Sequence, residues 1–410
     1  MLRSGHGPLK ETIMNQIPAL QHIKVLDISR LIPGPFATML LADFGAEVIR
    51  IDQPGGGRRQ AEEVFMSKEI SEESFSVFNR NKKRIGLNLK SPEALEIFDE
   101  LVKTADVLVE GYRPGVTKRL KVDYPRLREI NSKLIYCSIS GYGQDGPYKE
   151  KAGHALCYLG YSGLGSLFGG REKDKRSYFP TFLTSDIAGA GMTAVISILT
   201  ALVSREKTGM GQHIDLSITE SLLGLMHFEY SRYQTTSEPI RPGEARCTLG
   251  DPDANIYETK DTRFIAVNNS EPWMFKNFCE ILGRPDLSGF QFDSSKKQLL
   301  FEYFNGAFKT KTLKEWLKLF GNNEICVAPI NNIDEIHENP QFKHREMFVE
   351  IENLHGKKVR QIGLPFKLSA TPGQVRHGPL KEGANTDEIL SKLNIDASKI
   401  KSLKASGSVT

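Results

Sequence analysis

The sequence predicts an α/β fold, with a Rossmann-like, parallel-sheet large domain plus a small α+β domain. Strand-like and helix-like segments alternate through the first third of the chain, and repeated β-α-β units form parallel sheets with helices on both faces. Beyond residue 255, a second strand pair followed by a helix indicates the small domain. We therefore expect two domains of different architecture.

The elements of the large domain can be assigned in chain order. Gly45 ends the first helix, and Ser91-Pro92 begins the second as N-cap and first-turn proline. The helix after Asp186 is apolar on all sides, so we expect it to be buried. The expected strands are 22–29, 47–52, 84–89, 107–110 and 134–138, and the expected helices are 36–44, 92–104, 125–131 and 187–204.

Changes in composition predict the domain bounds. Residues 238–254 are rich in Pro, Gly, Arg and Asp, as is typical of a linker, and 256–268 and 271–282 supply a hairpin and a helix for the small domain. The predicted divisions are an N-terminal extension at 1–20, the large domain at 21–205, a linker at 206–250, the small domain at 251–330, and a C-terminal segment at 331–410 that returns to the large domain over an extended path.

The N-terminal extension contains a short repeat. The hexapeptide that starts at His6 recurs at His377. We interpret residues 1–13 as an upstream extension and Met14 as the natural start, with chance similarity as the alternative.

The composition of the chain narrows the classes of function that we expect. The chain has 410 residues and a net charge of +4, which does not favour nucleic acid as a partner and suits a small polyanionic ligand. We see no secretory signal and no apolar run that could span a membrane. The five cysteines are scattered without metal-ligand spacing, which favours a reduced, cytoplasmic protein with no metal site. No G-x-G-x-x-G motif follows the first strand, so a dinucleotide cofactor is not expected.

His154 and Asp186 are the candidate catalytic residues. Each lies in a segment of small residues, Ala152-Gly153-His154-Ala155 and Ser185-Asp186-Ile187-Ala188-Gly189, where a ligand could approach the backbone closely. An imidazole that titrates near neutrality and a carboxylate can together move a proton at carbon. On the residues alone, the structural roles are favoured, with His154 as a structural or surface residue and Asp186 as the N-cap of the following helix.

Several blocks of the chain resemble the family III CoA-transferase and racemase group, also called the CaiB/BaiF family. The similarity extends from about residue 23 to 373 and is closest to the α-methylacyl-CoA racemases of that group. The matching blocks are Leu26–Ser29, Pro33–Thr38, Ala46–Arg50, Asn79–Lys83, Glu110–Val116, Ser140–Pro147, His344–Phe348 and Pro365–Ser369.

This resemblance implies a ligand and a quaternary structure. The ligand would be a CoA thioester, acting as substrate with no metal or other cofactor, and two chains would interlock as a homodimer. The 3′-phosphate and pyrophosphate of CoA require cations, although a basic strip can also be a solvated strand edge. Gln53 stands where related racemases carry an arginine, so one phosphate contact would either be missing or be supplied by Arg50, Arg58 or Arg59. The implied CoA-binding residues are Arg50, Arg80, Lys82, Lys83, Gly111, Tyr112, Arg113 and Arg119, with Arg84 in the same basic strip.

The resemblance also implies roles for four residues. His154 and Asp186 would be the acid/base pair of a racemase, while in the transferases the matching Asp is the nucleophile. Glu271 would reach the His from the small domain of the partner chain, and Tyr158 would line the site. From the residues alone, Glu271 could be a helix-start carboxylate and Tyr158 a packing side chain.

Two departures from the racemase pattern keep the reaction open. Ala155 and Phe182 stand where racemases usually have polar residues, so this site is more apolar. Racemisation of a 2-methylacyl-CoA is the leading prediction. CoA transfer to a carboxylic acid is the alternative, and a CoA-binding relative that has lost catalysis is the third.

Overall fold

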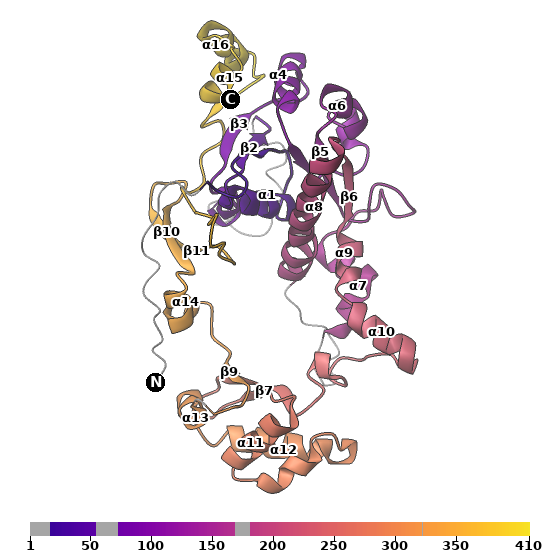
Figure 1. The fold of residues 1–410 in the computed structure, drawn as a ribbon, viewed down its shortest axis with the longest axis vertical. Coiled ribbons are helices and arrows are strands. Elements are labelled where there is room, and N and C mark those ends of the chain that lie inside the picture. Colours follow the sequence, from indigo (N-terminus) through magenta and orange to yellow (C-terminus); the bar gives the residue numbers. More distant parts are fainter. Residues whose placement is uncertain (1–16, 55–72, 169–180, 322) are drawn as a thin grey trace. The chain divides into compact units, whose positions relative to one another are not determined.

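The computed structural model describes residues 17–54, 73–168, 181–321 and 323–410 (Figure 1). The chain divides into two compact units. The first comprises Met1–Tyr158, Thr181–Leu222 and Lys343–Thr410, and the second comprises Leu159–Pro180 and Leu223–Phe342.

A six-stranded parallel sheet forms the centre of the first unit. Its strands lie in the order β3-β2-β1-β4-β5-β6, and every neighbouring pair is parallel. This confirms the predicted α/β class. The strands are β1 (Lys24–Asp27), β2 (Glu47–Asp52), β3 (Lys83–Gly86), β4 (Val107–Glu110), β5 (Ile135–Ser140) and β6 (His213–Ser217).

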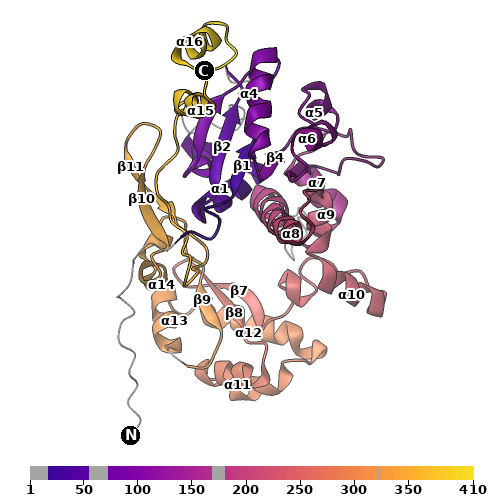
Figure 2. The ribbon, with the colours of Figure 1, turned by 45° about the horizontal axis from the view of Figure 1, so that its top comes forward.

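Helices cover both faces of this sheet (Figure 2). On one face, alternate strand residues such as Leu26, Ile49 and Leu108 share a buried cluster with Phe98 of α4. That face is covered by α4 (Pro92–Lys103), α6 (Tyr124–Ile130), α15 (Thr386–Lys392) and α16 (Ala397–Ala405). Helices α1 (Pro33–Asp43) and α8 (Met192–Thr208) pack together and against the other face.

Local sequence explains where the first helices begin and end. Gly45 follows α1 with φ of +105°, a conformation that favours glycine, and Pro18 packs where a Cβ would stand. The hydroxyl of Ser91 accepts the Ala94 N–H at the start of α4, and Pro92 occupies the first turn. These signals lie where the sequence predicts them.

The predicted linker at 206–250 contains regular structure instead. It includes β6, the last strand of the parallel sheet, because strand pairing with β5 satisfies its backbone and so extends the sheet beyond residue 205. It also contains α9 (Ile218–Gly224) and α10 (His227–Thr236). The irregular part begins only after α10.

The helix that carries Asp186 begins earlier than predicted. A π-helical segment, Leu183–Gly191, runs directly into α8, and Phe182 is its N-cap residue. Asp186 therefore lies inside the helix and does not cap it, so the capping interpretation is wrong. Wide π-helical turns often occur at functional sites.

The expectation that this helix is buried is also wrong in the single chain. Only Ala194, Ile198, Ala201 and Leu202 of α8 are buried, whereas Ile196 and Val203 on another face are about two-thirds exposed (65% and 64%). By length and composition, Leu183–Thr208 could cross a membrane, contrary to the sequence expectation. The core helix of a soluble protein passes the same test, so this is weak evidence for a membrane span.

The second unit has its own sheet and core. Three antiparallel strands, in the order β7-β8-β9, pack on helices through an aromatic cluster that includes Tyr257, Phe304 and Trp316. The elements are β7 (Ala254–Glu258), β8 (Phe264–Asn268), β9 (Val327–Pro329), α11 (Pro272–Ile281), α12 (Lys297–Phe308) and α13 (Leu313–Phe320).

The C-terminal segment has more regular structure than the predicted extended tail. After α14 (Pro340–His344), β10 (Phe348–Glu352) and β11 (Lys358–Ile362) form an antiparallel hairpin. The chain then runs to α15 and α16 beside β3 (Figure 1). Val409 pairs with Leu87, so the last residues extend the sheet edge.

Candidate active site at the carboxyl edge of the parallel sheet

The candidate site lies on segments that follow the carboxyl ends of β4 and β5, where parallel α/β sheets usually bind ligands. The chain leaves β4 at Glu110 and passes through Arg113 before α5 (Val116–Arg119). It leaves β5 at Ser140 and reaches α7 (Ala155–Ser162) through a loop that contains His154.

Tyrosine packing holds the loop that precedes His154. The Tyr158 hydroxyl donates to the Gly153 carbonyl at 2.6 Å, and the Tyr142 and Tyr158 rings meet edge to face at 5.3 Å. A Cβ on Gly141 or Gly153 would lie 2.5–2.6 Å from atoms of these rings, which real Cβ atoms do not tolerate. Glycine is therefore needed at both positions for the tyrosines to fix this backbone.

His154 lies at the start of α7 with its side chain exposed. Its carbonyl accepts the Cys157 N–H at 2.7 Å and the Tyr158 N–H at 3.3 Å, so the first turn of the helix fixes the His154 backbone. Because the imidazole is exposed, it can reach both solvent and a ligand.

Asp186 is half-buried and lies within electrostatic range of His154. The Ser185 hydroxyl donates to Asp186 Oδ1 at 2.7 Å. Burial raises the pKa of Asp186, although the Ser185 hydrogen bond and the charge of His154 both lower it. The charges of the two predicted acid/base residues therefore interact within the first unit.

Tyr158 and Arg113 belong to the same electrostatic neighbourhood. Burial raises the pKa of Tyr158, Tyr142 and Asp186 raise it further, and Arg113 lowers it. The charges of Arg113 and Asp186 thus act on Tyr158, and the charge of His154 acts on Asp186. These groups can transfer protons and hold an anion.

The small residues after Asp186 serve packing rather than ligand access. A Cβ on Gly189 would lie 2.8 Å from Leu222, and one on Gly191 would lie 2.7 Å from Phe36. Neighbouring side chains therefore fill the space that the sequence suggests for a ligand, because the π-helical segment packs closely on α1 and α9.

The basic strip forms internal ion pairs. Arg80 Nη2 lies 2.6 Å from Asp43 Oδ2, and Lys82 Nζ lies 3.0 Å from Asp27 Oδ2, with all four side chains buried. Arg50 also pairs with Asp27, at 3.2 Å. Burial of these cations beside carboxylates gives them a structural role in this conformation, and phosphate binding by them stays a prediction.

The two remaining cations of the strip also have carboxylate partners. Lys83 Nζ lies 3.0 Å from Glu47 and 2.8 Å from Glu388, and Arg84 Nε lies 2.8 Å from Asp52. The strip is therefore not a free solvated edge. Two further cations named from the sequence, at 58 and 59, lie outside the described residues.

The turn after β4 presents cations without such partners. Arg113 and Arg119 are exposed and form no ion pair with any residue that the structure describes. The Arg30 guanidinium lies over the Tyr112 ring, 4.8 Å from its centroid, and the Tyr112 N–H donates to Glu110 Oε2 at 2.7 Å. Gly111 leaves the turn close to the Arg30 backbone, with a Cβ position 3.5 Å from its nitrogen.

Glu271 lies in the second unit as the N-cap residue of α11. Within the described part of the chain its carboxylate makes no capping hydrogen bond. Its contact with the histidine of a partner chain stays a prediction.

Sequence reasoning missed three contributors to the site. Ser185 could have been found, because a hydroxyl directly before a catalytic carboxylate is a common hydrogen-bond donor to it. Arg30 and Glu110 act through Tyr112, and only the fold places them there.

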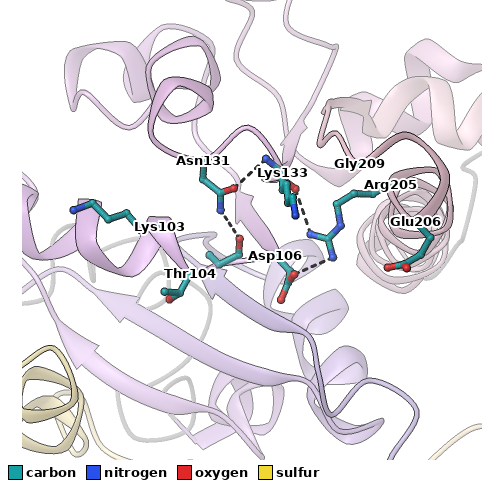
Figure 3. Close-up of a pocket in the computed structure, with 9 residues that line it drawn as sticks. Lys103, Thr104, Asp106, Asn131, Lys133, Arg205, Glu206 and Gly209 are labelled. Atoms are coloured by element: carbon teal, nitrogen blue, oxygen red, sulfur yellow. Dashed lines mark hydrogen bonds and ion pairs between the residues drawn. The ribbon is translucent and has the colours of Figure 1, made fainter.

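A separate cavity lies at the opposite edge of the sheet (Figure 3). It has a volume of about 420 Å³ and is lined by residues that precede β4, β5 and β6. Arg205 points toward Asp106, 2.9 Å away, and also donates to the Lys133 carbonyl. The described residues contain no cluster of three metal-ligating side chains, at this edge or elsewhere.

The chain is similar to known proteins over most of its length. The model of CoA-transferase family III matches residues 20–386. The chain is 31% identical to the human alpha-methylacyl-CoA racemase, over 94% of this chain and 96% of that protein. It is 33% identical to the human succinyl-CoA:glutarate CoA-transferase, over 93% of this chain and 87% of that protein.

A solved structure shares the fold. A CAIB/BAIF family protein from Brucella suis superimposes with a TM-score of 0.78 at 24% identity, covering 92% of this chain and all of that one. The match of the family model over most of its length shows that the chain belongs to CoA-transferase family III.

Proposed function

We propose that this protein is an α-methylacyl-CoA racemase, which inverts the α-carbon of a 2-methylacyl-CoA thioester. The observation that supports this most is the electrostatic proximity of His154 and Asp186. Similarity to the human alpha-methylacyl-CoA racemase over nearly the whole of both chains supports the same reaction.

The reaction needs two proton-transfer groups. One member of the pair removes the α-proton, and the electron pair moves into the thioester carbonyl to give an enolate. The protonated partner on the other face then returns a proton to the same carbon. The raised direction of the Asp186 pKa suits this role, because a group that both removes and returns protons works best when its pKa is shifted toward the operating pH.

The substrate's phosphates need cations near this pair. Arg113 and Arg119 are exposed and carry charges that no described carboxylate neutralises. We assign phosphate binding first to them, and Tyr112 and Gly111 shape the same turn. The reaction uses only side chains and a CoA thioester, so we propose no further cofactor.

CoA transfer is the second candidate. Asp186 would attack the thioester carbonyl, release CoA thiolate and form an acyl-aspartyl anhydride. The acceptor acid would then attack the Asp186 carbonyl and displace the donor as a free carboxylate. The CoA thiolate would finally attack the acceptor's carbonyl, which forms the new thioester and frees Asp186. The similarity to the human succinyl-CoA:glutarate CoA-transferase favours it. So does the apolar setting, because Ala155 and Phe182 offer no polar side chain to the substrate.

We also propose a homodimer. Met192, Ile196, Leu199 and Val203 form an exposed apolar stripe on α8 in the single chain. A second copy would cover it, and the partner's small domain would bring Glu271 to the imidazole. Light scattering tests the mass, and Ile196→Asp is expected to shift the protein toward monomer.

The five cysteines are all free, which supports a reducing, cytoplasmic location.

Mass spectrometry of a 2-methylacyl-CoA, incubated with the enzyme and acetate in heavy water, distinguishes the two reactions. Racemisation adds one deuterium to an otherwise unchanged thioester. Transfer produces acetyl-CoA without deuterium in the starting thioester, and hydroxylamine then traps an acyl-enzyme. If the active protein gives acetyl-CoA and no exchange, the racemase proposal is wrong.

A further inference from the structure

Glu110 is a buried carboxylate at the end of β4 with no part in the proton transfers described above. Its side chain is only 2% exposed, and its Oε2 accepts the backbone N–H of Tyr112 at 2.7 Å. Burying a carboxylate is costly unless its oxygens are hydrogen-bonded. One contact that offsets this cost, the bond from the Tyr112 N–H, fixes the turn after the strand.

A hydrogen-bonded chain connects Glu110 to the sheet edge. Ser138 lies beside Glu110 in the register of β4 and β5 and donates a side-chain hydrogen bond to it. The Ser138 hydroxyl also lies 2.9 Å from Nε2 of His213, on the edge strand β6. Tyr124 stacks on the His213 ring at 5.3 Å. The hydrogen-bonded chain that holds the carboxylate thus involves three neighbouring strands, β4, β5 and β6.

The surroundings of Glu110 make its ionisation sensitive to pH near neutrality. Burial raises the pKa of Glu110 to about 7, and the like charge of Asp215 contributes to this, while the hydrogen bonds from Ser138 and the Tyr112 N–H lower it. The charge of Glu110 also acts on Tyr136 and Cys137 of β5, whose own pKa values are raised by burial and by Glu110.

The turn that Glu110 holds carries Arg113, an exposed cation. Tyr112 is fixed by its N–H bond to Glu110 and by the Arg30 guanidinium over its ring. The next residue is Arg113, whose charge reaches Tyr158. If the Tyr112 bond were lost, the backbone next to Arg113 would lose the side-chain hydrogen bond that holds it, and only the contact between Arg30 and the Tyr112 ring would remain of these two.

We propose that Glu110 is a positioning residue for CoA binding. Its carboxylate is held by the hydrogen-bonded chain through Ser138 to His213, and it fixes the 111–113 turn so that Arg113 binds a phosphate. This rests on the proposed function in so far as the ligand is a CoA thioester. The bond to the Tyr112 N–H is strongest when the carboxylate is ionised. CoA affinity is therefore tied to the ionisation of Glu110.

The test measures the Kd of free coenzyme A by calorimetry on the full chain. Glu110→Ala is expected to weaken binding about tenfold, the size of one lost hydrogen bond to a charged group. Glu110→Gln keeps an oxygen for the Tyr112 N–H and stays within about threefold of the wild type. Glu129→Ala, an exposed carboxylate on α6, is the matched control and leaves Kd unchanged.

A pH series separates positioning from general stability. Comparison with Glu110→Gln cancels the titration of CoA itself. Relative to that variant, the wild type gains affinity by about threefold from pH 6 to pH 8, as Glu110 ionises. Ser138→Ala removes a bond that lowers the pKa of Glu110, so it moves the midpoint of this gain to higher pH. A merely structural serine would not shift that midpoint.

The outcomes distinguish this inference from the proposed function. A wild type that does not bind coenzyme A overturns both. A wild type that binds, with a folded Glu110→Ala of equal affinity, overturns the role of Glu110 alone. If Glu110→Ala does not fold, equal pH dependence in the wild type and Glu110→Gln overturns it instead.

Discussion

The two flanks of the parallel sheet carry basic side chains and use them in opposite ways. On the β1–β3 flank, the cations are enclosed by carboxylates: Lys82 and Arg50 share Asp27, and Arg80 pairs with Asp43. On the β4–β5 flank, Arg113 and Arg119 are exposed, without an ion pair among the residues described.

This difference shows that the cations of a basic sequence block can be used in internal ion pairs that stabilise the fold, and so are not free to bind a ligand. A buried cation between carboxylates would leave a buried negative charge behind if it moved to a phosphate, which costs more than the new contact returns. An exposed arginine has no such penalty. The first flank should therefore control stability, and the second should control binding and turnover.

The largest effect is expected from Asp186→Asn on the second flank. Both proposed reactions need this carboxylate, so turnover should fall by about 10⁴-fold, the upper range for an acid/base group. Its folded pKa is raised, so its contribution to stability is present below its unfolded pKa and is lost as pH rises through the folded pKa. The variant should thus be no less stable at pH 7.

Isotope exchange and urea unfolding on the same samples check this prediction. Full turnover of Asp186→Asn would contradict both reactions. A large loss of stability would show that the second flank is structural too, and the contrast between the flanks would fail.

Asp27→Asn should affect stability on the first flank. The substitution leaves Lys82 and Arg50 buried without their shared carboxylate, so the free energy of unfolding should fall by about 3–5 kcal/mol at pH 7. These cations hold the pKa of Asp27 far below its usual range, so its contribution is present above its unfolded pKa and is lost only in strong acid. Urea titration measures both effects.

Lys82→Met in the Asp27→Asn background provides the control. It removes one stranded charge and should recover part of the lost stability. No recovery would mean that the hydroxyls of Ser29 and Thr38, which also donate to Asp27, carry the effect.

His154→Gln should have an intermediate effect. The imidazole is exposed, so water can partly replace it, and α-proton exchange should fall by about 10²-fold. Exchange measured separately from each enantiomer shows which face His154 serves. Unchanged exchange from both enantiomers would make His154 structural and favour transfer through Asp186 alone.

The strands and helices of the sheet could be predicted from the sequence better than the pairing of its charged residues. Pattern and caps identify β1, α1, β2 and α4, because these signals are local. The pairing of Lys82 with Asp27 joins residues 55 positions apart, and no local signal reveals it. For the same reason the strand β6, far from its neighbour β5 in sequence, was expected to be linker.

The smallest predicted effects compare single cations from the two flanks. Arg113→Gln should raise KM for an acyl-CoA about tenfold with little change in kcat, because it removes one charge-assisted phosphate contact. Lys83→Gln should change KM by less than about twofold and stability by less than about 1 kcal/mol, since its ion pairs are partly exposed. Steady-state kinetics on both variants measure the two changes in KM.

An equal rise in KM for Lys83→Gln would mean that its carboxylate partners, Glu47 and Glu388, release it to the ligand, because these ion pairs are partly exposed. The cations of the basic strip could then leave their carboxylate partners to bind the phosphates of CoA, and an internal ion pair would not exclude a role in ligand binding.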